Sequence, residues 1–251
     1  LTVDLYFVKA LLHDDFLTGL YNAAITAGRI PYFLFYALTI ILLPAIAKSK
    51  TNTTDAETKS LVMQSLRLMV IILIPMLTLL YAYGAEVLQF FYGSRYAGAL
   101  AAYQIFLIGS GFLTVFYVFA FALAGAGRLA LPLIATIFGV IMTSVLNFIL
   151  IPTYGIAGAA TAVTLTSLLL MLYILIALVK EFAIKLPVRD FFISLLSSVI
   201  IFDLAFFLPK NVFVFIPFGV AFFALHLTFL WYAKVLTPKD LGPFAKMLKK
   251  S

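Results

Sequence analysis

Long apolar runs alternate with short polar or glycine-containing breaks along this chain, a pattern typical of a membrane protein with several helical spans. The runs predict eight helical segments, at about 1–12, 16–46, 61–83, 99–123, 130–150, 157–179, 191–208 and 212–233. A polar loop is expected at 51–59, a short extra segment begins at Gly84, and tight turns are expected at 13–15, 152–155 and 209–211. The predicted fold class is therefore all-α, a polytopic membrane helix bundle of about eight transmembrane helices.

Composition supports this prediction and excludes several classes of protein. The 251 residues are 65% hydrophobic and 11% charged, with a mean hydropathy of +1.15. A soluble domain is about 45–50% apolar and about 25% charged, so a soluble enzyme and a single-pass anchor are both excluded. The chain has no cysteine, which excludes disulfides and thiol chemistry, and its two histidines, His13 and His226, are too far apart in sequence to suggest a metal pair. No cofactor is predicted.

The net charge of +7 is better explained by membrane orientation than by nucleic-acid binding, and no nucleic-acid partner is expected. Most of the 17 Lys and Arg residues fall in the 48–67 loop, at Arg128, in the 180–190 loop and in the tail after residue 233. Only Arg95 and Lys210 fall on the other side, and Lys9 and Arg29 lie within spans. The positive-inside rule then predicts a multi-pass plasma-membrane protein with a cytoplasmic carboxyl terminus, surrounded by membrane lipids.

The chain begins at Leu1, within an apolar run that carries Asp4 and Lys9. This start lacks the basic region, uninterrupted apolar run and small-residue cleavage site of a signal peptide. We therefore expect the sequence to be a fragment whose first helix is truncated.

Polar residues inside the spans are the candidates for function, because an ionisable group in hydrocarbon is costly and normally faces a cavity or a partner. Arg29 stands about 20 Å along the second segment at 1.5 Å per residue, near the middle of the membrane. Gly28 and Pro31 flank it and permit a kink. A polar stripe on this segment consists of Thr18, Asn22, Arg29, Tyr32, Tyr36 and Thr39.

Two interpretations of Arg29 remain open at this point. It is either a structural cation paired with Asp4 or a binding group for an anionic substrate. Asp4 in turn is either the partner of Arg29 or an ion or proton site, which makes it the candidate for ion coupling. Lys9 lies near the end of its helix, where its long side chain can also reach the interface.

Other polar positions are expected to serve helix packing. Tyr103, Ser110, Thr114 and Tyr117 share one helix face, and Thr136, Thr143 and Asn147 share another. Hydroxyl and amide groups at such positions usually form interhelical hydrogen bonds. Asp203 and His226 are interpreted in the same way. No nucleophile–base pair, phosphate-binding glycine loop or metal cluster is visible, so the chain is not expected to be an enzyme.

Several stretches together resemble polysaccharide flippases of the multidrug, oligosaccharidyl-lipid and polysaccharide exporter superfamily. They are the start Val3–Lys9, Tyr21-Asn22-Ala23-Ala24, Leu42–Ile46, Phe91–Tyr96, Asn147 and Ile151–Ala160. The resemblance covers nearly the whole chain and implies the carboxyl-terminal half of a fourteen-span transporter. It implies a six-helix lobe over 1–179, and two further helices with a basic tail over 180–251.

The resemblance also implies a function and a missing partner. Such flippases are thought to move polyprenyl-pyrophosphate-linked saccharides through a cavity between two lobes by alternating access, with cavity cations holding the pyrophosphate. The resemblance implies that Arg29, helped by Lys9, attracts the diphosphate. Asn22, Tyr32 and Tyr36 are then expected to contact sugar or phosphate oxygens. The amino-terminal lobe of the same protein would then supply the other cavity wall. Two alternatives are a cation-coupled multidrug exporter of the same superfamily and, from another class, a membrane-embedded enzyme that modifies lipids.

Overall fold

The computed structural model describes residues 3–52, 55–207 and 212–232, and in these ranges the chain is helical, without strands. The elements are α1 (Val3–Leu12), α2 (Asp15–Gly28), α3 (Ile30–Asn52), α4 (Asp55–Ala82), α5 (Gly84–Tyr92), the 3₁₀-helix η1 (Ser94–Ala99), α6 (Leu100–Gly125), α7 (Ala130–Phe182), α8 (Val188–Phe207) and α9 (Val212–Tyr232). The predicted outer turn at 209–211 and the basic tail after residue 233 lie outside the described residues.

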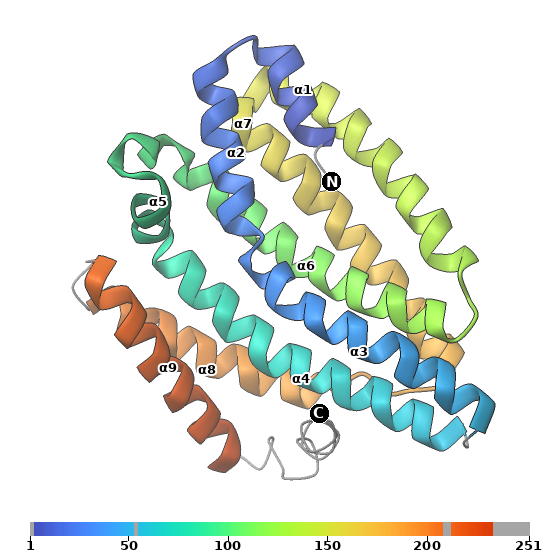
Figure 1. Cartoon of the computed structure of the whole chain (residues 1–251). Helices are drawn as coiled ribbons and strands as arrows, with labels where there is room; N and C mark the ends of the chain where they lie inside the picture. Colours follow the sequence, from blue (N-terminus) through green and yellow to red (C-terminus); the bar gives the residue numbers. More distant parts are fainter. Residues whose placement is uncertain (1–2, 53–54, 208–211, 233–251) are drawn as a thin grey trace.

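The helices form a bundle in which α6 occupies the centre (Figure 1). It packs against α2 and α3 on one side and α7 on the other, while α8 and α9 lie against α4. Among the described residues, two large apolar clusters of buried side chains surround α6, and a small one joins Leu79 to Phe222. One of the large clusters joins α1, α2 and α5 to the first half of α6, and the other joins α3 and α4 to its second half and to the end of α7. Within the described ranges, three stretches are long and apolar enough to cross a membrane: Thr58–Ala82, Ser94–Gly125 and Ala130–Phe182.

The segment predicted as one helix over 16–46 is two helices, because the chain breaks at Arg29. The Arg29 amide bonds back to the Thr26 carbonyl at 3.3 Å, and the residue has φ −85° and ψ 0°. Pro31 has no N–H with which to continue the helical hydrogen bonds. Gly28 and Pro31 were predicted to permit a kink, and here α2 ends and α3 begins. The prediction of a polar loop at 51–59 was wrong for most of its length: α3 runs on to Asn52, and α4 already begins at Asp55.

The turn expected at 152–155 lies inside α7, which reverses direction at Gly155 (φ 58°, ψ −138°). The two limbs of α7 then run back along each other, as the light green and gold helices in Figure 1. They approach closely near the reversal, since a Cβ on Gly158 would lie 2.2 Å from the Leu150 carbonyl oxygen. The predicted segments 130–150 and 157–179 correspond to these limbs.

A buried histidine joins α9 to α4 at a proline in the middle of α4. Pro75 has no N–H, so the Ile71 carbonyl four residues earlier lacks its helical donor. The His226 Nε2 lies 3.0 Å from that oxygen, and Nδ1 lies 2.8 Å from the Ser197 hydroxyl of α8. A carbonyl can only accept, so Nε2 carries the hydrogen. In the neutral imidazole Nδ1 is then an acceptor, and the one Ser197 hydroxyl hydrogen is shared between Nδ1 and the Ser194 carbonyl, 2.9 Å away. The prediction that His226 makes a packing hydrogen bond is confirmed.

Two more polar contacts attach α8 to the same stretch of α4. The Ser194 hydroxyl donates to the Val70 carbonyl at 3.3 Å, and Arg67 Nε lies 2.7 Å from Asp190 Oδ2. Together with Ile71, the α4 residues in these contacts lie between positions 67 and 71, little more than one helical turn. The α8–α9 pair is therefore held on α4 by a compact group of hydrogen bonds beside the Pro75 interruption.

Replacing His226 by Ala should lower the free energy of unfolding in detergent by about 1–2 kcal/mol, because the Ile71 carbonyl loses its donor. In a Pro75→Ala background the cost should shrink by about 1 kcal/mol, since residue 75 then supplies an N–H to that carbonyl. A double-mutant cycle measured by thermal or SDS unfolding tests this. Thr228→Ala, which removes an exposed hydroxyl from the same helix, is the control. Additive costs would contradict the assignment.

Replacing Gly155 by Ala should destabilise the protein by about 1–3 kcal/mol, because an L side chain is strained at φ 58°. Gly19 in α2 provides the matched control. A Cβ meets nothing within 4 Å at either position, so the comparison isolates the backbone angle. Gly19→Ala should be neutral or should stabilise by up to about 1 kcal/mol. The same unfolding assay measures both, and equal effects would show that the reversal does not depend on glycine.

Candidate functional site

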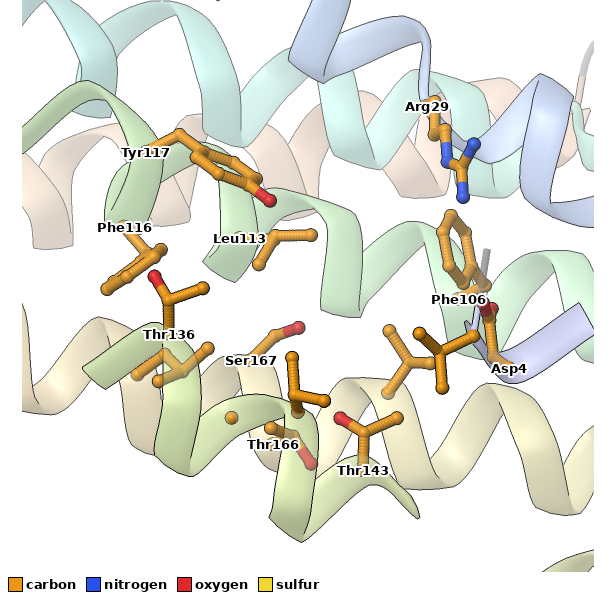
Figure 2. A pocket seen from close by; sticks show the side chains of 15 residues that line it. Asp4, Arg29, Phe106, Leu113, Phe116, Tyr117, Thr136, Thr143, Thr166 and Ser167 are labelled. Atoms are coloured by element: carbon orange, nitrogen blue, oxygen red, sulfur yellow. The ribbon is translucent and has the colours of Figure 1, made fainter. Parts of the chain in front are cut away.

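A pocket of about 120 Å³ lies where α1 and the α2–α3 break face α6 and both limbs of α7. Its lining consists of Val3, Asp4, Arg29, Phe106, Leu113, Phe116, Tyr117, Thr136, Gly139, Val140, Thr143, Val163, Thr166, Ser167 and Leu170. Most of these side chains are apolar. The charged side chains of Arg29 and Asp4 lie near Phe106 at one end of the pocket, and hydroxyl groups line the remainder (Figure 2).

Arg29 enters the pocket from the break between α2 and α3. Its Cζ atom lies 6.0 Å from the centre of the Phe106 ring, close enough for a cation–π contact. Phe106 in turn lies directly against Gly28, where an added Cβ would be 2.6 Å from the ring. The lack of a side chain at residue 28 therefore lets Phe106 occupy the place below Arg29 that is seen in Figure 2.

Asp4 contributes the carboxylate of the pocket from α1. Its side chain is buried, with 5% exposure, and accepts a hydrogen bond of 2.6 Å from the Tyr21 hydroxyl of α2. This bond joins the first two helices and fixes one carboxylate oxygen. Asp4 lies on the side of the Phe106 ring away from Arg29 in Figure 2, so a cation and an anion share one end of the pocket.

Hydroxyl groups line the remainder of the pocket. Tyr117 of α6, Thr136 and Thr143 of the first α7 limb, and Thr166 and Ser167 of the second limb contribute them. Thr136 donates to the Pro132 carbonyl of its own helix. The Thr166 hydroxyl is buried without a hydrogen-bond partner among the described residues. The pocket thus offers at least one polar group that is not already used in packing.

Asn147 continues the face of α7 that carries Thr136 and Thr143, one turn closer to the Gly155 reversal. It is completely buried, and neither its amide nitrogen nor its amide oxygen has a hydrogen-bond partner in the described part of the chain. The interhelical hydrogen bond predicted for Asn147 is therefore absent there. A buried amide normally costs free energy unless its groups are satisfied, which marks this position as unusual.

The structure brings together two of the six predicted site residues, Arg29 and Asp4, as lining of the pocket. Tyr32 lies next to it, with its ring centre 5.3 Å from that of Tyr117. The other three lie elsewhere. Lys9 is exposed and forms an ion pair with Asp15, while Asn22 and Tyr36 are exposed side chains outside the pocket lining. The break at Arg29 also means that the predicted polar stripe does not follow one continuous helix.

Sequence reasoning did not identify Phe106 as a pocket residue and treated Thr166 and Ser167 only as part of an apolar segment. Phe106 is one of 26 phenylalanines, and nothing in its local pattern distinguishes it from the others. Tyr117 did appear in a polar pattern with Tyr103, Ser110 and Thr114. Those three are buried with hydrogen bonds to backbone carbonyls, whereas Tyr117 faces the pocket.

No group of three or more His, Asp and Glu side chains capable of holding a metal ion occurs in the described ranges. The pocket also contains no serine or threonine next to a histidine base, because His226 lies in the α4–α8–α9 contact. The side chains that line the pocket can bind charged and hydroxylated groups.

The fold is similar to that of a solved structure, "Lipid II flippase MurJ, inward closed conformation". The TM-score is 0.79 with 17% sequence identity, over 93% of this chain and 51% of the solved chain. A membrane protein of Methanocaldococcus jannaschii described as uncharacterized, MJ1375, is 26% identical over 167 residues, which cover 66% of this chain and 38% of that protein. The chain thus spans about half of the solved structure and less of the archaeal protein.

The match to the solved structure confirms the predicted all-α fold. A family match adds information about the kind of protein. The family described as "Lipid II flippase MurJ" matches residues 14–230, which is most of the chain. A flippase is a transporter, in agreement with the prediction that the protein is not an enzyme. On this evidence the chain belongs to the MurJ lipid II flippase family.

Proposed function

We propose that this chain is part of a transporter that moves a polyprenyl-pyrophosphate-linked saccharide across the plasma membrane by alternating access, as a step in polysaccharide biosynthesis. The observation that carries the proposal is the position of Arg29, the cation among the residues that line the pocket, at a helix break deep in the bundle. Membership of a family described as lipid II flippases supports the same class of substrate. Lipid II is therefore the first substrate to test.

The guanidinium of Arg29 suits a diphosphate better than other groups in the lining do. It presents several N–H donors in one plane, which can form paired hydrogen bonds to phosphate oxygens. A cation within a membrane span is costly unless it has anionic or aromatic neighbours. While the substrate is absent, the Phe106 ring and the Asp4 carboxylate are neighbours that stabilise Arg29 in the pocket. Substrate binding and structural pairing are thus compatible roles for Arg29 in different conformations.

The size of the pocket limits how much of the substrate it can hold. Pockets for drug-sized ligands have volumes of about 300–1,000 Å³, and this one measures about 120 Å³. It has room for the diphosphate and not for the saccharide as well. We assign the saccharide to the outer side of α2 and α3, where Asn22, Thr26 and Tyr36 are exposed and Tyr32 is half-buried.

Exposed polar groups on a membrane helix do not face lipid readily, since hydrocarbon offers them no hydrogen bonds. We therefore propose that this face borders a cavity completed by an amino-terminal lobe of the same protein. In this scheme residues 1–179 form the second lobe and 180–251 the additional helices with a cytoplasmic tail. The division agrees with the attachment of α8 and α9 to the outer side of α4.

Asp4 is the proposed coupling site for a cation gradient. It is the carboxylate among the pocket-lining residues, and its bond to Tyr21 links its charge to the packing of α1 on α2. A cation bound at Asp4 would weaken its attraction for Arg29 and so alter the affinity of Arg29 for an anion. Occupation of the two charges would then be linked, which is what coupled transport requires.

Replacing Arg29 by Ala in the full-length protein should reduce flipping of lipid II, or of other lipid-linked oligosaccharides, at least tenfold. The loss of one charge-assisted contact of about 1.5–3 kcal/mol accounts for this effect. Arg29→Lys should retain part of the activity, and Lys185→Ala, which removes an exposed cation outside the pocket, should be silent. Flipping is measured in vesicles at matched protein abundance. Normal flipping by Arg29→Ala would reject the assignment, and drug export in its place would favour the multidrug alternative.

Replacing Asp4 by Asn keeps an acceptor for Tyr21 but removes the charge. Flipping driven by an imposed sodium or proton gradient should then fall to the rate measured without a gradient. The matched control is Asp203→Asn, an exposed carboxylate of α8, which should preserve the gradient dependence. If Asp4→Asn leaves gradient dependence intact and lowers only protein abundance, Asp4 is a structural partner of Arg29 and the coupling role is wrong.

A further inference from the structure

The connection between α4 and α6 forms a surface that the proposed transport function does not use. It consists of α5 and η1, residues 84–99, and it joins two helices that are each long and apolar enough to cross a membrane. A segment that links two such helices lies at one membrane surface. In Figure 1 α5 is seen almost along its axis while α4 and α6 are seen lengthwise, so α5 is steeply inclined to both.

The position of α5 on the bundle is fixed by its buried face. Glu86, Val87 and Leu88 are buried, and α5 packs against α2, α6 and α9. Tyr103, at the start of α6, donates a hydrogen bond of 3.0 Å to the Leu80 carbonyl near the end of α4. This bond holds together the two helix ends that α5 and η1 connect. None of the pocket-lining residues belongs to α5 or η1. This element therefore has its own packing and its own exposed face.

The exposed residues of α5 are Ala85, Gln89, Phe90 and Phe91, so its exposed face is mainly apolar. Phe90 and Phe91 are 55% and 59% exposed, and their ring centres are 5.1 Å apart. The group continues into η1 through Tyr92 and Tyr96, whose ring centres are 5.4 Å apart. Two adjacent phenylalanines exposed to this degree would be unfavourable in water, at about 25 cal/mol for each Å² of apolar surface.

A cation follows Phe90, Phe91 and Tyr92 along the chain, in η1. Arg95 is exposed, and its Cζ atom lies 5.5 Å from the centre of the Phe16 ring at the start of α2. Phe16 is itself 48% exposed, so Arg95 connects η1 to another exposed aromatic ring, at the beginning of α2. Aromatic rings beside a basic residue at the end of membrane spans are the composition that favours the lipid headgroup region.

We infer that α5 and η1 lie in the membrane interface, with Phe90 and Phe91 inserted at the boundary of the acyl chains and Arg95 bound to a phospholipid phosphate. The inclination of α5, its apolar exposed face and the single cation at its end all fit this partner. The steep angle between α5 and the spans places its axis along the membrane plane, the orientation of an interfacial amphipathic helix. The contact anchors the end of the bundle where α4, α6 and α9 meet α5.

A tryptophan substituted for Phe91 reports by its fluorescence how deeply residue 91 lies in the bilayer. In full-length protein reconstituted into phosphatidylcholine–phosphatidylglycerol vesicles, the fluorescence added by Phe91→Trp should be quenched more by lipids brominated at acyl carbons 6–7 than at 11–12, and little by aqueous iodide. Phe138→Trp, on an exposed part of the first α7 limb, provides a deep control and should show the opposite lipid preference. Quenching by iodide alone, or by neither reagent, would show water or protein over this face and overturn the inference.

The role of Arg95 is tested in the same background. Arg95→Gln should weaken quenching by shallow bromine at least twofold, because the phosphate contact that holds η1 at the interface is lost. Unchanged quenching would reject Arg95 as the anchor. Flipping activity does not enter either measurement, so failure of the transport proposal and failure of this inference are distinguishable.

Discussion

Hydrocarbon supplies no hydrogen bonds, and so every interruption of a helix in this bundle has to be completed by the protein itself. Pro75 leaves the Ile71 carbonyl without a donor inside α4, and the imidazole of His226 occupies the vacant place. At the α2–α3 break the Arg29 amide turns back to Thr26. Each of these two irregular places also carries an ionisable side chain, the buried His226 and the half-buried Arg29.

The break at Arg29 determines where the charge of that residue lies. A continuous helix would place Arg29 among a stripe of polar residues that faces one direction. The break instead turns α3 away from α2 and leaves the guanidinium over Phe106, in the space enclosed by α1, α6 and α7. Asp4 reaches the same space because its bond to Tyr21 holds α1 against α2. The charges of the pocket are therefore a consequence of helix packing at two junctions.

Sequence patterns predicted most of the helices and the type of protein, since a span must be apolar over its whole length and its ends must be polar. They were less successful with side-chain partners. Lys9 and Arg29 looked alike as cations within spans, yet Lys9 pairs with Asp15 near a surface and Arg29 lines the pocket. The residues 51–59 looked like a loop because they are polar, but polar residues continue a helix readily once it leaves the membrane.

By itself the sequence determined that the protein is a helical membrane bundle, where most of its helices lie, and that Arg29 and Asp4 are among the costly charges within it. Only the tertiary structure decided that these two share a pocket with Phe106, that Asn22 and Tyr36 lie outside it, and that His226 completes α4. The physical reason is that hydrophobicity acts on each segment separately. Contacts between side chains of α1, α6 and α7 depend on crossing angles and helix breaks, which arise only when the segments pack together.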